Sequence, residues 1–137
     1  MHILALDQGT TSSRAAVVDG SGRIVAMGQV QLTQHYPAPG LVEHDPAEIW
    51  RSTVSAIKDA LASARMEPRD LAAIGITNQR ETVVGWDPDT GEPIHHALVW
   101  QDRRTSNRCD ELREAGHEAL VRSSVVGRHH CDVPLSK

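Results

Sequence analysis

Apolar residues form three short runs near the start of the chain, with turn-forming residues between them. The runs cover residues 3–6, 14–18 and 24–30. Residues 19–22, Asp-Gly-Ser-Gly, separate the second run from the third and are a strong turn signal. Short apolar runs joined by tight turns predict three consecutive antiparallel strands, which together make a meander.

A helical pattern follows a loop that contains proline and glycine. Asp45 suits the N-cap, Pro46 the first helical position and Glu48 the third position of a capping box. Apolar residues then recur on one helical face, at Trp50, Val54, Ile57 and Leu61. We predict a helix that begins after Asp45, ends near Pro68 and places this face, including Trp50, in the core.

The rest of the chain alternates apolar runs with turns. We predict strands at residues 71–77, 82–86 and 95–100, a turn at 87–91, and a helix at 103–115 that contributes Leu112 to the core and ends at Gly116. The helix before residue 71 would form a crossover back to the sheet. This order of elements predicts an α/β domain with a mixed sheet that opens with the antiparallel three-strand meander. No helix follows the first glycine, which excludes the start of a Rossmann fold.

Composition limits the classes of protein that fit. The chain has 137 residues, 39% of them hydrophobic and 23% charged, which is ordinary for one globular domain. The net charge is −4 and the 14 Lys and Arg are scattered, so nothing suggests binding to nucleic acid. Cys109 and Cys131 form no CxxC pair, which favours a reducing compartment. Without a signal-peptide pattern or a long apolar run, we expect a cytoplasmic protein with no membrane span.

The turn between the first two apolar runs gathers residues that suit a phosphate group. Asp7 ends the first run and could hold Mg²⁺ directly or through a water molecule. Gly9 would let the backbone approach a ligand closely. Hydroxyl, backbone N–H and guanidinium donors come from Thr10, Thr11, Ser12 and Arg14. The same residue types are common in hairpin turns that only face solvent, and this alternative stays open.

Four longer motifs carry a resemblance to a known family. They are ALDQGTTSSR at 5–14, YPAPGLVEHDPAEIW at 36–50, AAIGITNQRET at 72–82 and ALVWQDRRT at 97–105. In this order they resemble the glycerol kinase branch of the FGGY family of carbohydrate kinases. The resemblance extends over residues 3–124, which is nearly the whole chain.

The resemblance implies a fold and an activity. The fold would be the ribonuclease H-like type of actin, Hsp70 and sugar kinases, of which this chain would be a truncated N-terminal part. The activity would be that of a transferase, an ATP-binding kinase of glycerol metabolism that uses Mg²⁺ and gives sn-glycerol 3-phosphate. The resemblance allows a homo-oligomer for the intact family enzyme. Its ligands would be glycerol and ATP.

The resemblance also implies site residues. The ATP phosphates would lie at Thr10, Thr11, Ser12 and Arg14, with Mg²⁺ near Asp7, and glycerol would lie at Arg80, Glu81 and Trp100. An adjacent Arg and Glu together offer the donors and acceptors that an uncharged polyol needs. No catalytic residue is expected in this chain, because the general-base aspartate of the family lies in a second domain. Without the resemblance, a solvated charge pair and a core tryptophan would be the simpler interpretations.

The resemblance stops near Ser124. We therefore expect an incomplete kinase domain at residues 1–124 and a divergent tail at 125–137. A frameshift would produce such a tail, whereas a small zinc site is a weaker alternative because adjacent ligands rarely reach one metal ion. The chain alone is then expected to be inactive. Two further alternatives are a fragment of another FGGY polyol or sugar kinase and a non-catalytic remnant that at most binds phosphate.

Overall fold

The computed structural model describes residues 1–125. The elements are β1 (His2–Gln8), β2 (Ser12–Asp19), β3 (Ile24–Gln31), β4 (Glu43–His44), α1 (Pro46–Ala64), the 3₁₀ helix η1 (Pro68–Asp70), β5 (Leu71–Asn78), β6 (Ala97–Leu98), α2 (Ser106–Glu114) and α3 (Glu118–Val125). They form two units: the first is Met1–Asp102, and the second begins at Arg103. Each unit is described by itself.

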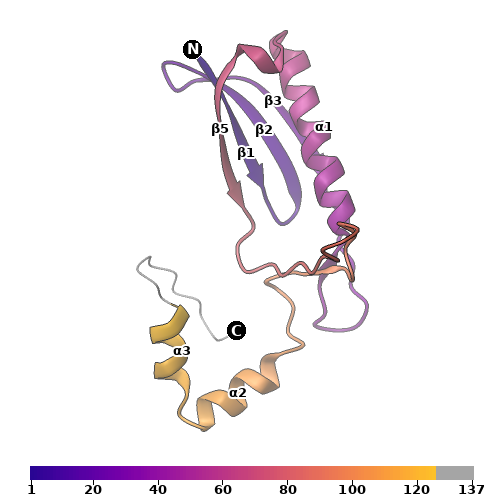
Figure 1. The fold of residues 1–137 in the computed structure, drawn as a ribbon, viewed down its shortest axis with the longest axis vertical. Helices are drawn as coiled ribbons and strands as arrows, with labels where there is room; N and C mark the ends of the chain where they lie inside the picture. The colour runs from indigo at the N-terminus through magenta and orange to yellow at the C-terminus, as the bar shows by residue number, and fades with distance from the viewer. Residues whose placement is uncertain (126–137) are drawn as a thin grey trace. The chain divides into compact units, whose positions relative to one another are not determined.

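A four-stranded mixed sheet forms the centre of the first unit. Its strand order is β3-β2-β1-β5 (Figure 1). The pairs β1–β2 and β2–β3 are antiparallel, whereas β5 lies parallel to β1. The helix α1 makes the crossover that a parallel neighbour requires. The predicted meander, crossover and mixed α/β sheet are therefore confirmed.

The core lies between α1 and one face of the sheet. Leu4, Ala15 and Val17 from the strands meet Ala56 and Ala60 of α1, and all five are buried. The small helix residues let the backbones come close together. A Cβ built on Gly28 of β3 would collide with the carbonyl oxygen of Ala56, so only glycine fits at this contact.

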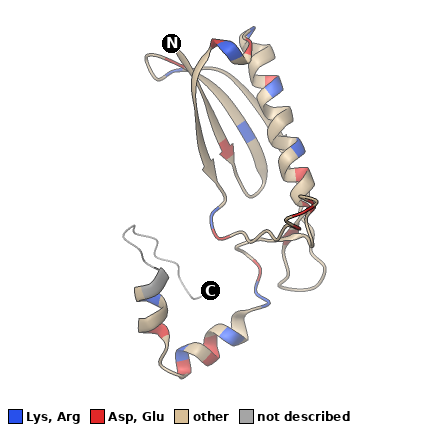
Figure 2. Cartoon of the chain, in the orientation of Figure 1, with Lys and Arg blue, Asp and Glu red and all other residues tan. Residues whose placement is uncertain are grey.

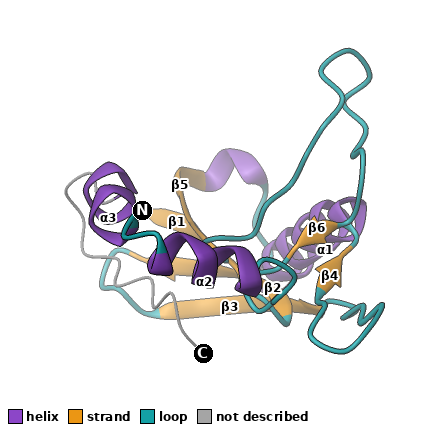
Figure 3. Ribbon diagram, turned by 90° about the horizontal axis from the view of Figure 1, so that it is seen from below, coloured by secondary structure: helices purple, strands orange, loops and turns teal. Residues whose placement is uncertain are grey.

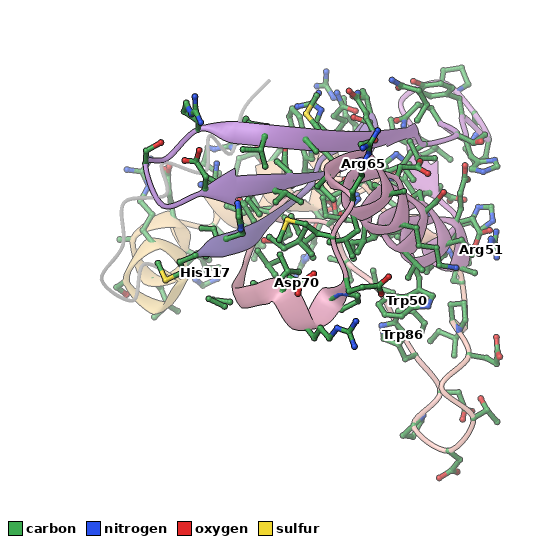
Figure 4. All side chains as sticks on the ribbon, turned by 90° about the horizontal axis from the view of Figure 1, so that it is seen from above. Trp50, Arg51, Arg65, Asp70, Trp86 and His117 are labelled. Atoms are coloured by element: carbon green, nitrogen blue, oxygen red, sulfur yellow. The ribbon has the colours of Figure 1, made fainter. Side chains whose placement is uncertain are left out.

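The face of α1 that packs on the sheet agrees only in part with the predicted one. Trp50 is 69% exposed and does not belong to the core (Figure 4). The buried positions of the helix instead include Ser52, Ala56 and Ala60, which recur every four residues. The prediction is confirmed for Leu61, which is buried in the core, and for Ile57, which packs against it, but it was wrong for Trp50. Where α1 comes closest to the sheet, the buried positions are small residues.

The ends of α1 follow local capping rules. The Asp45 carboxylate accepts a hydrogen bond from the N–H of Ala47 at 2.8 Å, and Pro46 is the first helical residue. Arg65 adopts a left-handed conformation (φ 54°) and ends the helix at Ala64, earlier than predicted. Glu48 does not complete the expected capping box with its side chain. Its carboxylate accepts hydrogen bonds from the N–H and hydroxyl of Thr33.

The segment after β5 has less regular structure than the sequence suggests. Residues 82–86 contain two isolated bridges, from Val83 and Trp86, in place of the predicted strand. Of residues 95–100, only Ala97–Leu98 form a strand, β6, which pairs with β4 (Figure 3). Val83 and Trp86 are 63% and 51% exposed, so no core contact holds this segment as a longer ladder.

The second unit contains two short helices. The helix α2 begins at Ser106, three residues later than predicted, and none of its residues is buried, Leu112 included. Its ion pairs, such as Arg108–Glu111 and Arg113–Asp110, join neighbouring turns. The predicted divergent tail lies, apart from Val125, outside the described residues. Among residues 1–125, no helix is long and apolar enough to cross a membrane.

Candidate functional site

Two loops leave the same edge of the sheet because β1 and β5 run parallel. Gln8 pairs with Asn78 where these strands end. Since the carboxyl ends of parallel strands lie at one edge, residues 9–11 and residues 79–81 emerge next to each other. We call residues 9–11 the phosphate loop and residues 79–81 the polyol turn, after the ligands that the sequence predicts for them.

The phosphate loop is held through its carbonyl groups. Each carbonyl accepts one hydrogen bond: Gly9 from Gln8 at 3.1 Å, Thr10 from Gln34 at 2.9 Å and Thr11 from Leu32 at 2.9 Å. The N–H of Gly9 donates to the carbonyl of Ser12 at 3.0 Å and closes the turn. A Cβ on Gly9 would lie 3.1 Å from that carbonyl oxygen, which is why glycine fits here.

The backbone N–H groups of the phosphate loop remain for another acceptor. Within residues 1–125, the N–H groups of Thr10 and Thr11 donate to no protein atom. Consecutive N–H groups of this kind form concave sites that attract anions. The fixed carbonyls and the available N–H groups together suit a phosphate oxygen.

Asp7 and Arg14 lie beside the phosphate loop as a cross-strand pair. Their side chains face away from α1, with Arg14 Nη1 3.3 Å from Asp7 Oδ2. Both side chains are about half exposed, and few other charges lie on the strands (Figure 2). An ion pair this exposed contributes only ~0–1 kcal/mol, so little opposes a new partner for either group.

The accessible carboxylate of Asp7 fits the demands of Mg²⁺. Among residues 1–125, no group of three or more His, Cys, Asp or Glu side chains is placed to hold a metal ion. Magnesium needs no such cluster, since it usually keeps several waters and is held by one or two carboxylates and the substrate phosphates. Asp7, which lies next to a loop predicted to bind phosphate, agrees with that pattern.

The two serines that follow the loop have different environments. Ser12 is buried and its oxygen accepts a hydrogen bond from the Gln29 amide at 3.0 Å. Ser13 points to the other face of the sheet, where its hydroxyl lies 2.8 Å from that of Ser52 in α1. Ser13 therefore joins the sheet to the helix, and Ser12 is the serine on the side of Arg14.

Trp100 joins the two groups of predicted site residues. Its indole Nε1–H donates to the Thr10 hydroxyl at 2.9 Å, across 90 positions of sequence. The ring is 53% exposed, so one end is held by the phosphate loop while much of its surface faces outward. A predicted polyol contact thus lies directly beside a predicted phosphate contact.

The polyol turn presents Arg80 and Glu81 at the surface. Both residues are exposed and follow β5 within a few residues. Glu81 has φ 65°, a conformation that non-glycine residues rarely adopt. Backbone strain of this kind is concentrated at ligand-binding sites.

Four uncharged residues connect the phosphate loop to the polyol turn. None of them is among the site residues predicted from the sequence. They are Gln8, Gln34, His44 and Gln79. Gln34 lies in a loop that carries no recognisable signal. His44 and Gln79 lie inside the VEHDP and NQRET stretches quoted above, which was the only available indication of their importance.

Comparisons with known proteins identify the family of the chain. The model of the FGGY family of carbohydrate kinases, N-terminal domain, matches residues 2–137. The chain belongs to the FGGY family. This confirms the resemblance that the four sequence motifs suggested.

Several curated glycerol kinases are similar to the chain in sequence. The chain is 65% identical over 119 residues to the glycerol kinase of Allorhizobium ampelinum, and 57% identical over 124 residues to that of Polaromonas naphthalenivorans. These alignments cover 87% and 90% of the chain, but only 24% and 25% of the relatives. The chain therefore matches about a quarter of the length of these relatives, and corresponds to the N-terminal region of glycerol kinases.

Solved structures of a glycerol kinase and a xylulose kinase share the fold. The glycerol kinase of Plasmodium falciparum, solved with ADP, superposes with a TM-score of 0.78 at 31% identity, covering 88% of this chain and 24% of that one. A xylulose kinase of Brucella ovis gives a TM-score of 0.80 at 24% identity, covering 90% of this chain and 25% of that one. The second likeness concerns the fold alone. Both support the ribonuclease H-like, sugar kinase type of α/β domain.

Proposed function

We propose that these residues form the N-terminal part of an ATP-dependent glycerol kinase. The intact enzyme would transfer the terminal phosphate of ATP to a primary hydroxyl of glycerol and release sn-glycerol 3-phosphate and ADP. The observation that carries the proposal is the 2.9 Å hydrogen bond from Trp100 to Thr10, which joins the predicted polyol side to the predicted phosphate side. The identity to curated glycerol kinases supports the choice of substrate.

On the phosphate side, the N–H groups and hydroxyls of Thr10 and Thr11 would bind phosphate oxygens. The buried Ser12, bonded to Gln29, would support the loop. Arg14 would neutralise charge that develops on the transferred group. Asp7 would hold Mg²⁺, which when bound screens the phosphate charges from each other. Phosphoryl transfer depends almost entirely on positioning and on charge stabilisation, so a rigid loop with fixed carbonyls suits it.

On the polyol side, Arg80 and Glu81 would provide the donors and acceptors for the glycerol hydroxyls. Hydrogen bonds to charged partners are about twice as strong as neutral ones, which suits a small ligand without charge. Trp100 would cover the C–H surface of glycerol. Its bond to Thr10 would keep the attacking hydroxyl close to the terminal phosphate.

A chimeric enzyme provides the test. Residues 1–124 of this chain would replace the corresponding segment of the A. ampelinum glycerol kinase, to which they are 65% identical over 119 residues. We expect glycerol-dependent conversion of ATP to ADP with formation of sn-glycerol 3-phosphate. Xylulose and gluconate serve as competing substrates, and a preference for either would replace the proposal by that of another FGGY sugar kinase.

The 137-residue chain by itself is expected to show no turnover. Residues 1–125 provide one side of the proposed site, and the general base is expected in the part of the relatives that this chain does not match. Glycerol-dependent ADP release by the purified chain, prepared from a host that lacks glycerol kinase, would contradict this expectation. Phosphate or nucleotide binding without turnover would agree with it.

A further inference from the structure

We propose that His44 is a positioning residue that fixes the phosphate loop relative to the polyol turn. The inference rests on the proposed function and adds a residue to it. His44 belongs to β4, directly before the N-cap of α1, and its side chain is 1% exposed. It contacts one glutamine from each side of the site, namely Gln34 and Gln79.

The hydrogen bonds assign a direction to every contact of the imidazole. Gln34 donates through Nε2 to the carbonyls of Thr10 and Leu32, so its Oε1 must accept. His44 Nε2 lies 2.9 Å from that oxygen and is therefore the N–H of the ring. His44 Nδ1 is then an acceptor, and it faces Gln79 Nε2 at 3.3 Å.

The remaining bonds agree with this assignment. Gln79 Oε1 accepts from the Thr82 hydroxyl at 3.2 Å, which leaves its amide nitrogen as the donor toward His44 and Gln8. Gln8 in turn donates to the carbonyl of Gly9. The chain of contacts thus begins and ends in the phosphate loop and passes through the polyol turn. Each amide is used in one orientation only.

A neutral ring is the form that this network requires. A second proton on His44 would bring an N–H against the amide N–H of Gln79, where two donors face each other. Burial lowers the pKa of His44, the nearby charge of Glu48 opposes that shift, and His35 adds to it. The group is therefore held neutral and connects the two loops as one donor and one acceptor.

Buried hydrogen bonds of this kind fix the positions of the groups that they join. A buried donor or acceptor left without a partner is costly, so Gln34 and Gln79 hold their orientations only while His44 satisfies them. Through Gln34 the ring determines where the Thr10 carbonyl lies. Through Gln79 it determines where the strained turn with Arg80 and Glu81 begins.

Two substitutions separate the two contacts. In His44→Asn the shorter amide reaches the place of Nδ1, keeps the contact with Gln79 and loses the contact with Gln34. In His44→Gln the longer amide reaches the place of Nε2, keeps the contact with Gln34 and loses the contact with Gln79. The same two changes at the exposed His95, which among the described residues contacts the carbonyl and the ring of the adjacent His96, are the matched controls.

The experiment measures KM for ATP, KM for glycerol and kcat in the chimeric enzyme described above. We expect His44→Asn to raise KM for ATP by about fivefold to tenfold, with KM for glycerol changed by less than about twofold. We expect His44→Gln to do the opposite: KM for glycerol should rise by about fivefold to tenfold, and KM for ATP should change by less than about twofold. The His95 variants should leave all three constants unchanged.

Three outcomes would overturn the proposal: no effect, an equal effect on both KM values in both variants, or a loss of kcat alone. Amide hydrogen exchange of the same proteins keeps the test independent of activity. Exchange should increase at residues 9–12 in His44→Asn and at residues 79–82 in His44→Gln, whereas uniform loosening would indicate a general structural role. An inactive unsubstituted chimera would refute the proposed function, and the exchange data would still decide the role of His44.

Discussion

Thr10 has two roles that single residues seldom combine. Its carbonyl and hydroxyl accept hydrogen bonds from Gln34 and Trp100 respectively, while its N–H donates to no protein atom within residues 1–125. The same residue is therefore both anchored and available to a ligand. Trp100 is 53% exposed, and its indole N–H is anchored to Thr10 by this bond.

The bond between Thr10 and Trp100 can be tested by a double-mutant cycle. We expect Thr10→Val and Trp100→Phe each to lower kcat/KM for glycerol in the chimera. Because both changes remove the same hydrogen bond, the double variant should lose about threefold to tenfold less than the product of the single effects. Thr10→Ser keeps the hydroxyl and is the control. Independent, multiplicative effects would show that the bond does not couple the two residues.

Asp45 is expected to stabilise α1 in a pH-dependent manner. Burial raises its pKa, but the N–H groups of Ala47 and Glu48 and the side chain of Arg51 outweigh this effect, so the net pKa is lowered. A lowered folded-state pKa contributes stability above the unfolded value of about 3.9, and this is lost as the pH falls through the folded value.

Urea unfolding of the 137-residue chain measures this contribution. At pH 7 we expect Asp45→Ala to lower the free energy of unfolding by about 1 kcal/mol. Asp45→Asn keeps an accepting oxygen and should cost less. The advantage of the natural Asp45 over Asn should shrink as the pH falls from about 5 to 3. An advantage that stays constant over that range would disprove the role of the charge.

At the scale of elements, the decisive feature is the close approach of α1 to the sheet. Helical spacing and the Asp45-Pro46 signal predicted that α1 exists and where it starts. They placed Ile57 and Leu61 correctly against the core but also placed Trp50 there, because the sequence shows no sign that Gly28 would meet the backbone of Ala56. Close to that contact the buried positions of α1 are Ser52, Ala56 and Ala60, and Trp50 lies outside the core.

Gly28→Ala tests this contact. The new methyl group would collide with the Ala56 carbonyl and lie 2.8 Å from the Asp59 Cβ, and helix backbone cannot move aside as a side chain can. We expect the free energy of unfolding to fall by about 1–3 kcal/mol or more. Gly75→Ala in β5 is the control, since nothing lies within 4 Å of the new Cβ. Equal unfolding midpoints for the two variants would contradict a tight contact at Gly28.

The part of the candidate site that could be predicted from sequence consists of residues whose charge, hydroxyl group or lack of a side chain suggests ligand binding. The acid, hydroxyl and glycine cluster at residues 7–12 and the Arg80-Glu81 pair were found from sequence, and the parallel β1–β5 pairing brings them to one edge. The amides of Gln34 and Gln79 are uncharged and 45 positions apart, so no periodicity or spacing indicates that both contact His44. Such a network exists only once the fold brings three segments together.

At the scale of the whole molecule, the two units differ in how much they bury. The first unit has a core between α1 and the sheet, with β1 and β2 bonded on both sides. In the second unit, within the residues that the structure describes, neither helix has a buried residue. Helices of eight or nine residues are marginal in water when no tertiary packing supports them.

Amide hydrogen exchange of the 137-residue chain tests this difference. We expect the amides of β1 and β2 to exchange at least about 100-fold more slowly than those of α2 and α3, because local ion pairs such as Arg122–Glu118 add only a few tenths of a kcal/mol each. The edge strand β5 is paired only with β1 among the described strands, so its amides should exchange at an intermediate rate. Equal protection of α2 and β1 would mean that the second unit has packing partners, because its own helices cannot provide such protection.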